Sequence, residues 1–437
     1  MTDIQIQQYQ KALDKTLKAQ DNQAIIAAYI ELGHAYLEIK DMPKGYTQFD
    51  QALKVAQKVK DQHAETRLLG LVGICLKQLG NYDAAMQSFR KSLRTAKKIE
   101  DQRMECDALY QIGALLVDQG ESLEAISHLD NALLLSLQIQ DHKRKLAITN
   151  QMGNIFLTLE SVDKAIENYA TALDTAQTLG DKEAEAASRV HLGQTFLLDD
   201  DYQAAIENFE LGLEIADQVN SPTIEMQALY GLTQASDAAG RNSLALIYGE
   251  QVVNKAQQVN AAAEEVQAIQ TLVGILNRNK QYTKAITYLE RGVLLAQTKQ
   301  DHDWELRFLT DKGLTHYLND ELEEARLAME KAHEITVRFQ QQQEEAFIAG
   351  RQASILADLG QLEASNKKIQ RSIQLAETLE LPLLKGEQLV LKALNARDLD
   401  KSVDAVKYLD EALVIYQEIE REDLQKEIEA LKKDLAG

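Results

Sequence analysis

The sequence predicts an all-α fold, an α-solenoid in which about ten helix–turn–helix repeats stack into a right-handed superhelix. The first observation is a period of forty residues, which runs through the 437-residue chain without insertion or deletion. The second is a composition rich in Leu, Ala, Gln, Glu and Lys with only three prolines, which favours helix. Because a repeat of this size is too small to bury its own apolar face, neighbouring repeats must stack on one another.

Columns of residues read at intervals of forty show where the helices of a repeat touch. One column is small, and its members are Gly45, Ala85, Ala125, Ala165, Ala205, Ala245, Ala285, Ala325, Ser365 and Ala405. Twelve residues before it lies a second small column that starts with Gly33 and Gly73, and four residues after it stand large residues such as Phe49 and Phe89. Small side chains let two backbones approach closely, so we expect the two helices of each hairpin to meet at these columns.

Residues 21 to 60 illustrate one repeat. Asp21 precedes apolar residues at helical spacing up to Tyr36, and a break at residues 41–43 separates this first helix from a second one. Asp or Ser caps the free amides at a helix start, and one of them recurs at the equivalent place in later repeats: Asp61, Asp101, Asp141, Asp181, Ser221 and Asp301. Glycines that suit a left-handed helix end stand at the corners: Gly80, Gly120, Gly240 and Gly360.

The same columns divide the chain into repeats and caps. Tyr9 and Ala12 stand forty residues before Phe49 and Ala52, so the N-terminal segment forms half a repeat. Terminal units with a polar outer face are what a solenoid requires for solubility. The predicted domains are an N-terminal capping helix in residues 1–20, ten repeats in residues 21–420 and a C-terminal capping helix in residues 421–437.

Composition restricts the partners and the location. The formal net charge of −21 argues against nucleic acid or an anionic membrane as a ligand, because phosphates would be repelled. The two cysteines, Cys75 and Cys106, occupy non-equivalent places in successive repeats, which predicts no disulfide scaffold and fits a reducing compartment. Neither a secretory signal nor an apolar run of about eighteen residues is visible. We expect a cytoplasmic protein, and the sequence leaves its oligomeric state open.

Catalytic and metal-binding motifs are missing from the sequence. The eight histidines are scattered without a zinc-binding spacing, and no glycine-rich phosphate loop occurs. The run Asp199-Asp200-Asp201 lies at a predicted helix corner, where we expect a solvated turn rather than a cation site. Trp304 near a helix start is expected to pack within the repeat rather than anchor a ligand. The sequence therefore predicts no enzyme, no cofactor and no metal.

The columns resemble the tetratricopeptide repeat, whose pattern combines small and aromatic residues at fixed positions. The first repeat matches that pattern with Tyr29, Leu32, Gly33, Tyr36, Gly45, Phe49 and Ala52. The fourth repeat matches it with Met152, Gly153, Phe156, Ala165, Tyr169 and Ala172. The usual period is about thirty-four residues, and the extra residues here fall between Gly45 and Gly73. This is similar to the long-helix variety found in Pins-type adaptors, kinesin light chains and bacterial repeat proteins.

The resemblance implies that the first helix of each repeat lines a concave groove. Amide side chains there would suit the backbone of a bound peptide, because they both donate and accept hydrogen bonds, and tyrosines are typical interface anchors. The predicted peptide-binding residues are Tyr110, Gln111, Asn150, Gln151, Asn154, His191, Gln194, Gln227, Tyr230, Gln234, Gln267, Gln270, Asn277, Arg307 and Tyr317. Asn150 stands where related chaperone-binding repeats need a lysine to hold a C-terminal carboxylate, which argues against that ligand.

Two functions follow from this interpretation. The first is a non-enzymatic scaffold or adaptor for protein–protein interaction, which binds a peptide segment of a partner in the concave groove. The alternative is a bacterial-type regulatory receptor for a short signalling peptide. Such receptors resemble this chain in their repeats but usually carry an N-terminal effector domain, for which residues 1–20 leave room for a single helix.

Overall fold

The computed structural model describes residues 3–436, and every secondary-structure element in this range is an α-helix. Residues 1, 2 and 437, which belong to the predicted capping segments, lie outside the described part. The chain divides into two compact units, of which the first ends at Ala235 and the second begins at Ser236. The prediction of an all-α fold is confirmed.

The helices are nearly equal in length and follow one another at intervals of about twenty residues. The first unit contains α1 (Asp3–Ala19), α2 (Asn22–Glu38), α3 (Met42–Val59), α4 (Gln62–Gln78), α5 (Tyr82–Lys98), α6 (Gln102–Asp118), α7 (Ser122–Gln138), α8 (His142–Thr158), α9 (Val162–Leu179), α10 (Lys182–Leu198) and α11 (Tyr202–Gln218). Helix α12 (Pro222–Ala238) contains the boundary between the units. The second unit continues with α13 (Asn242–Gln258), α14 (Ala262–Arg278), α15 (Tyr282–Lys299), α16 (His302–Leu318), α17 (Leu322–Arg338), α18 (Gln342–Asp358), α19 (Leu362–Thr378), α20 (Pro382–Asp398), α21 (Ser402–Glu418) and α22 (Glu422–Ala436).

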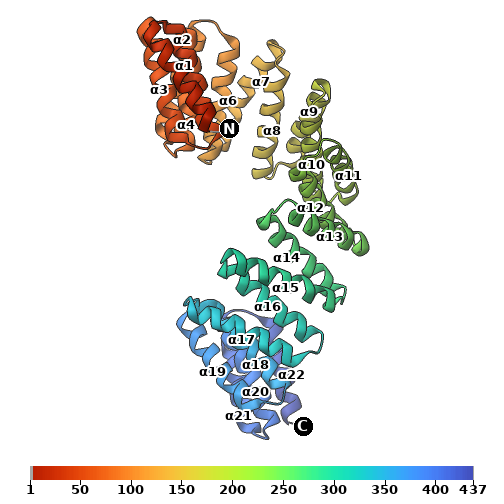
Figure 1. Cartoon of the computed structure of the whole chain (residues 1–437). Coiled ribbons are helices and arrows are strands. Elements are labelled where there is room, and N and C mark those ends of the chain that lie inside the picture. Colours follow the sequence, from red (N-terminus) through yellow and green to blue (C-terminus); the bar gives the residue numbers. More distant parts are fainter. Residues whose placement is uncertain (1–2, 437) are drawn as a thin grey trace. The chain divides into compact units, whose positions relative to one another are not determined.

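Within each unit, consecutive helices pack as hairpins, and each hairpin packs on the next. The pairs α2 with α3, α4 with α5 and α6 with α7 are joined by extensive contacts, and so are the pairs α16 with α17 and α18 with α19 (Figure 1). Helices that are neighbours along the chain are thus also neighbours in space, as in an α-solenoid. The division into ten repeats and two caps, and the right-handed superhelix, stay predictions.

The helix caps predicted at aspartates are present, whereas the Ser221 hydroxyl donates a hydrogen bond of 3.1 Å to Glu183. In six first helices of the hairpins the capping Asp accepts a hydrogen bond from a backbone amide three residues later, and these residues are Asp21, Asp61, Asp101, Asp141, Asp181 and Asp301. Each such cap stabilises its helix by about 1 kcal/mol. Several second helices are capped in the same way by Asp41, Asn81 and Asp201.

The small columns lie where the two helices of a hairpin touch. A Cβ atom added to Gly33 would come within 2.5 Å of the Phe49 ring, and one added to Gly73 within 2.4 Å of the Phe89 ring. Both phenylalanines are fully buried. The aromatic ring of the second helix therefore occupies the space that glycine leaves open in the first, which explains the pairing of small and large columns in the sequence.

Every junction between helices turns through one left-handed residue. Positive φ angles occur at residue 20 and then at intervals of twenty up to residue 420. Glycine takes this position at Gly80, Gly120, Gly180, Gly240 and Gly360, which confirms the four corner glycines that the sequence predicts and adds Gly180. At the other junctions the residue is not glycine, as at Gln140 with φ 55°. The repeat thus fixes the backbone of the corner even where the residue type does not favour it.

Candidate functional site

The predicted groove residues lie on the first helices of the hairpins, distributed over both units. Ten of them, from Tyr110 to Gln234, belong to α6, α8, α10 and α12 in the part that ends at Ala235. The remaining five belong to α14 and α16 in the second unit. In the first unit α6 contacts both α4 and α8, so the three first helices form one continuous face. Their role in binding stays a prediction.

Several amides of the first unit have no partner within the described part of the chain. The side-chain oxygen Oδ1 of Asn150 is buried and accepts no hydrogen bond from any described residue. Gln111 and Gln151 are half-buried and Gln194 is exposed, and none of their side chains bonds to another described residue. A buried polar atom without a partner costs free energy of folding, about 1–3 kcal/mol. This face therefore carries hydrogen-bonding capacity that the fold itself does not use.

Other predicted groove residues are engaged inside the protein. Asn154 accepts a hydrogen bond of 2.6 Å from the hydroxyl of Tyr169, which ties α8 to α9. In the second unit, Asn277 donates to the hydroxyl of Thr315 at 2.9 Å, and Tyr317 donates to Asp358 at 2.6 Å. Their side chains hold neighbouring helices together, which reduces what they could offer to a ligand.

Two aromatic groove positions are covered by side chains of neighbouring helices. The Arg144 guanidinium lies 5.3 Å from the centre of the Tyr110 ring and forms an ion pair with Asp107. Burial raises the pKa of the Asp107 carboxyl, although Arg144 opposes the shift. His191 lies 5.0 Å from the Tyr169 ring, and burial lowers the pKa of its imidazole, so it is neutral at pH 7. Tyr110 and His191 are therefore less accessible to a ligand than residues of an exposed groove would be.

A cleft of about 330 Å³ opens on this same face between α4 and α6. Leu71, Ile74 and Met104 provide apolar walls, Gly70 leaves its centre open, and Arg67 stands at the rim. Of its lining residues, Gln111 alone belongs to the predicted peptide-binding set. A signal was present, because Gly70 stands forty residues before Tyr110 in the same column and lacks the large side chain found there.

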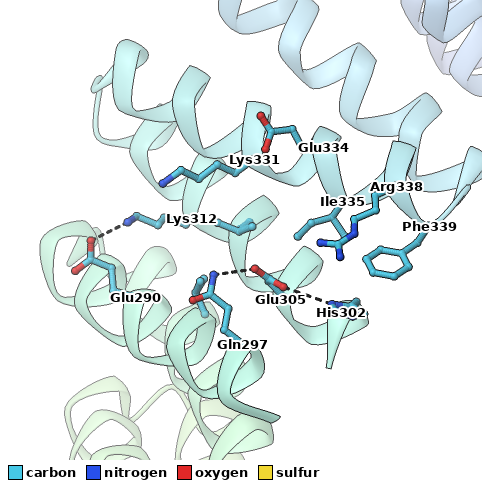
Figure 2. A pocket seen from close by; sticks show the side chains of 12 residues that line it. Glu290, Gln297, His302, Glu305, Lys312, Lys331, Glu334, Ile335, Arg338 and Phe339 are labelled. Atoms are coloured by element: carbon cyan, nitrogen blue, oxygen red, sulfur yellow. Dashed lines mark hydrogen bonds and ion pairs between the residues drawn. The ribbon is translucent and has the colours of Figure 1, made fainter. Parts of the chain in front are cut away.

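A larger cavity of about 620 Å³ lies in the second unit, between α15, α16 and α17 (Figure 2). Lys312 reaches Glu290 at 2.7 Å, and the Glu305 carboxylate accepts a hydrogen bond of 2.8 Å from Gln297. The charged residues of its wall are three acids and three bases: Glu290, Glu305, Glu334, Lys312, Lys331 and Arg338. Because their formal charges balance, the cavity favours neither a cationic nor an anionic ligand.

A difference between neighbouring repeats explains this cavity. Glu265 and Glu345 stand forty residues before and after Glu305, and each is bridged across the same groove by an arginine, Arg291 at 2.7 Å and Arg371 at 2.8 Å. The equivalent residue here is Lys331, which forms no ion pair with Glu305 or any other described residue. The bridge that closes the groove in both neighbouring repeats is missing, and a cavity remains.

The acidic run at residues 199–201 and Trp304 have structural roles, as expected from the sequence. Asp201 caps α11 and Asp200 accepts a hydrogen bond of 2.7 Å from Tyr202, so the acidic run forms a turn as predicted. Trp304 stacks on Phe308 with 5.5 Å between ring centres. Within residues 3–436 no group of three or more His, Cys, Asp or Glu side chains is placed to hold a metal ion. Among the helices of this range, none has the length and apolar character to cross a membrane.

Sequence and structure comparisons agree on the fold family. A sequence profile of the tetratricopeptide repeat matches residues 24–98 and 145–218. The chain is similar to a signal-transduction ATPase with a tetratricopeptide-repeat sensor from Pyrococcus horikoshii, at 13% identity over 84% of this chain, with a TM-score of 0.57. It covers 55% of that protein. It is also similar to the apo form of RapI, at 14% identity over 82% of this chain and 98% of RapI, with a TM-score of 0.56.

A search of curated protein sequences finds no match. At such low identities the similar structures bear on the fold alone. The two matched stretches cover less than half of the chain, and they share its forty-residue pattern and its stacked hairpins. These two stretches are tetratricopeptide repeats, and the hairpins of each unit have the fold of such repeats.

Proposed function

We propose that this protein is a non-enzymatic scaffold that binds a peptide segment of a partner protein on the face formed by the first helices of its hairpins. The supporting observation is the set of amides on α6, α8 and α10 that the fold leaves without partners, above all the buried Oδ1 of Asn150. A peptide backbone that leaves water needs donors and acceptors of this kind. Protein binding is also the general role of tetratricopeptide repeats.

The proposal includes a cytoplasmic location and partners other than nucleic acid. Cys75 and Cys106 are buried and unpaired, and burial raises the pKa of their thiols to about 11 and about 12, which keeps them protonated and unreactive. Such thiols persist in a reducing compartment. The net charge of −21 opposes binding to a polyphosphate.

The test removes the unpartnered amides. The partner is first identified by affinity purification from native cells, and synthetic peptides from the bound region are titrated by calorimetry. Replacing Asn150, Gln151 and Gln194 together by alanine is expected to weaken binding at least about tenfold, because each lost hydrogen bond contributes about 0.5–1.5 kcal/mol. Asn154 stays unchanged, since its bond to Tyr169 would confuse lost binding with lost packing.

A matched control separates this face from the remaining surface. Gln87 on α5 and Gln138 on α7 are exposed amides on second helices of the hairpins. Their double replacement by alanine is expected to leave the affinity unchanged. Equal affinity of the triple variant and the wild type would show that the peptide binds elsewhere. The receptor alternative differs in its ligand, since a free short peptide would then bind as tightly as the whole partner does.

A further inference from the structure

We propose that the cleft between α4 and α6 anchors the partner peptide through one large apolar side chain, and that Arg67 binds a carboxylate next to it in the peptide. This inference rests on the proposed function and adds to it the chemistry of the ligand. The cleft has a volume of about 330 Å³ and lies wholly within the first unit.

Gly70 keeps the centre of the cleft open without a packing reason. A Cβ atom added there would meet no atom within 4 Å. The equivalent position in other repeats carries a larger residue, as in Ile30, Tyr110, Asn150, Val190 and Tyr230. Glycine in the interior of a helix destabilises it relative to alanine. The fold therefore does not require glycine at this place, and the missing side chain creates the cleft.

Another glycine of the same column shows the contrast. A Cβ atom added to Gly350 would lie 2.7 Å from Nε2 of Gln388, whose side chain is buried against it. Packing explains that glycine, because any side chain would collide with its neighbour. At Gly70 no residue in the described range fills the equivalent space. A side chain from a second molecule is what the space is shaped to receive.

The cleft walls indicate an apolar side chain. Leu71 and Ile74 on α4 face Met104 on α6, and all three are half-buried, so each still exposes apolar surface. Transfer of a leucine- or phenylalanine-sized side chain from water onto such walls is favourable. Methionine adapts its shape to what it contacts, which suits a site for a foreign side chain.

The rim of the cleft indicates an anion beside that side chain. Of its three arginines, Arg103 pairs with Asp141 at 3.4 Å and Arg144 pairs with Asp107. Arg67 is exposed and forms no hydrogen bond or ion pair with any residue in the described range. A guanidinium binds a carboxylate through paired hydrogen bonds. Two carboxylates also line the cleft: Asp107 is paired with Arg144, and Asp101 accepts a hydrogen bond from the backbone amide of Met104. Among the described residues of the lining, Arg67 is therefore the charged group that is left to bind a ligand anion.

The probe is a phage-displayed library of random peptides, selected against the full chain, with selected sequences synthesised and titrated by calorimetry. We expect these peptides to share a large apolar residue next to Asp or Glu. Gly70→Leu fills the cleft and should weaken their binding at least about tenfold. Its thermal midpoint should be no lower than that of the wild type, because leucine is the better helix former. Arg67→Glu should also weaken binding, and a peptide with Lys in place of the acid should bind this variant better than the original peptide does.

The matched control is Gln87→Leu on α5, which adds the same side chain at an exposed position of a second helix, away from the cleft. This variant should bind the peptides within about twofold of the wild type. Peptides that bind Gly70→Leu as tightly as the wild type would overturn the anchor. If those peptides still lost affinity for the Asn150, Gln151 and Gln194 variant, the proposed function would stand without it. A library that yielded no binding peptide would overturn both.

Discussion

Alanine at Gly70 is expected to stabilise the protein and alanine at Gly73 is not, although the two residues lie one turn apart in α4. An added methyl group meets nothing within 4 Å at Gly70. At Gly73 the same group would lie 2.4 Å from Cε1 and 2.7 Å from Cδ1 of the Phe89 ring. Phe89 is fully buried, so the ring has no free space into which it could move.

The magnitudes follow from two effects. Alanine gains about 1 kcal/mol over glycine in a helix interior, and this gain applies at both positions. A methyl group forced into a packed core costs about 1–3 kcal/mol. Gly70→Ala should therefore raise the free energy of unfolding by about 1 kcal/mol, and Gly73→Ala should leave it unchanged or lower it by up to about 2 kcal/mol. The gain in helix propensity is the same at both positions. The difference in free energy of unfolding between the two variants therefore measures the cost of the collision with Phe89.

Amide hydrogen exchange of α4 and α5 is the suitable assay, because a stack of repeats need not unfold in a single step. Protection of these amides should increase in Gly70→Ala and decrease in Gly73→Ala relative to that variant. Urea denaturation followed by circular dichroism gives the corresponding change for the whole chain. Equal protection in the two variants would refute the assignment of Gly73 to a close contact, and with it the reading of the small columns as contact sites.

Two further predictions concern single sites. Gln140 holds the left-handed conformation at φ 55°, so Gln140→Gly is expected to raise the thermal midpoint by relieving a strain of about 1 kcal/mol, and a lowered midpoint would contradict this. His191 has a folded pKa below its ordinary value of 6.5 because of burial, so the unfolded chain binds the proton first. The contribution of His191 to stability is then constant above pH 6.5 and falls as the pH drops from there towards the folded pKa. Thermal melts should show a smaller loss of midpoint temperature at low pH in His191→Gln than in the wild type. An equal loss would assign the effect to other groups.

The fold could be predicted because its determinants are local and repeated. A cap such as Asp61 acts on amides within three residues, and the pair Gly73 and Phe89 recurs with the same spacing in other repeats. Each repeat is thus independent sequence evidence for the same contact between two helices. The left-handed corners without glycine, as at Gln140, could not be read from the residue type, because the two flanking helices impose that conformation.

The site was less predictable, because its properties depend on pairs of side chains that are far apart in the sequence. Asn154 and Gln194 look alike as groove amides, yet only Asn154 is occupied, by the hydroxyl of Tyr169. Whether an arginine is free depends equally on its neighbours, as Arg144 and Arg67 show. Position in the repeat predicts which face a residue lies on, but it does not predict whether another side chain already binds it.

A residue that differs from its column is the more informative signal of a binding site, provided that no neighbouring side chain fills the space or replaces the contact that is lost. Lys331 stands where Arg291 and Arg371 bridge to a glutamate, and nothing replaces that bridge, so a cavity remains. Gly70 departs from a column of larger residues, and no described side chain fills the space beside it. Gly350 departs from the same column, but there the side chain of Gln388 fills the space beside the glycine. In a stack of similar units a ligand can be distinguished only where one unit differs, so uncompensated differences are where specificity has to arise.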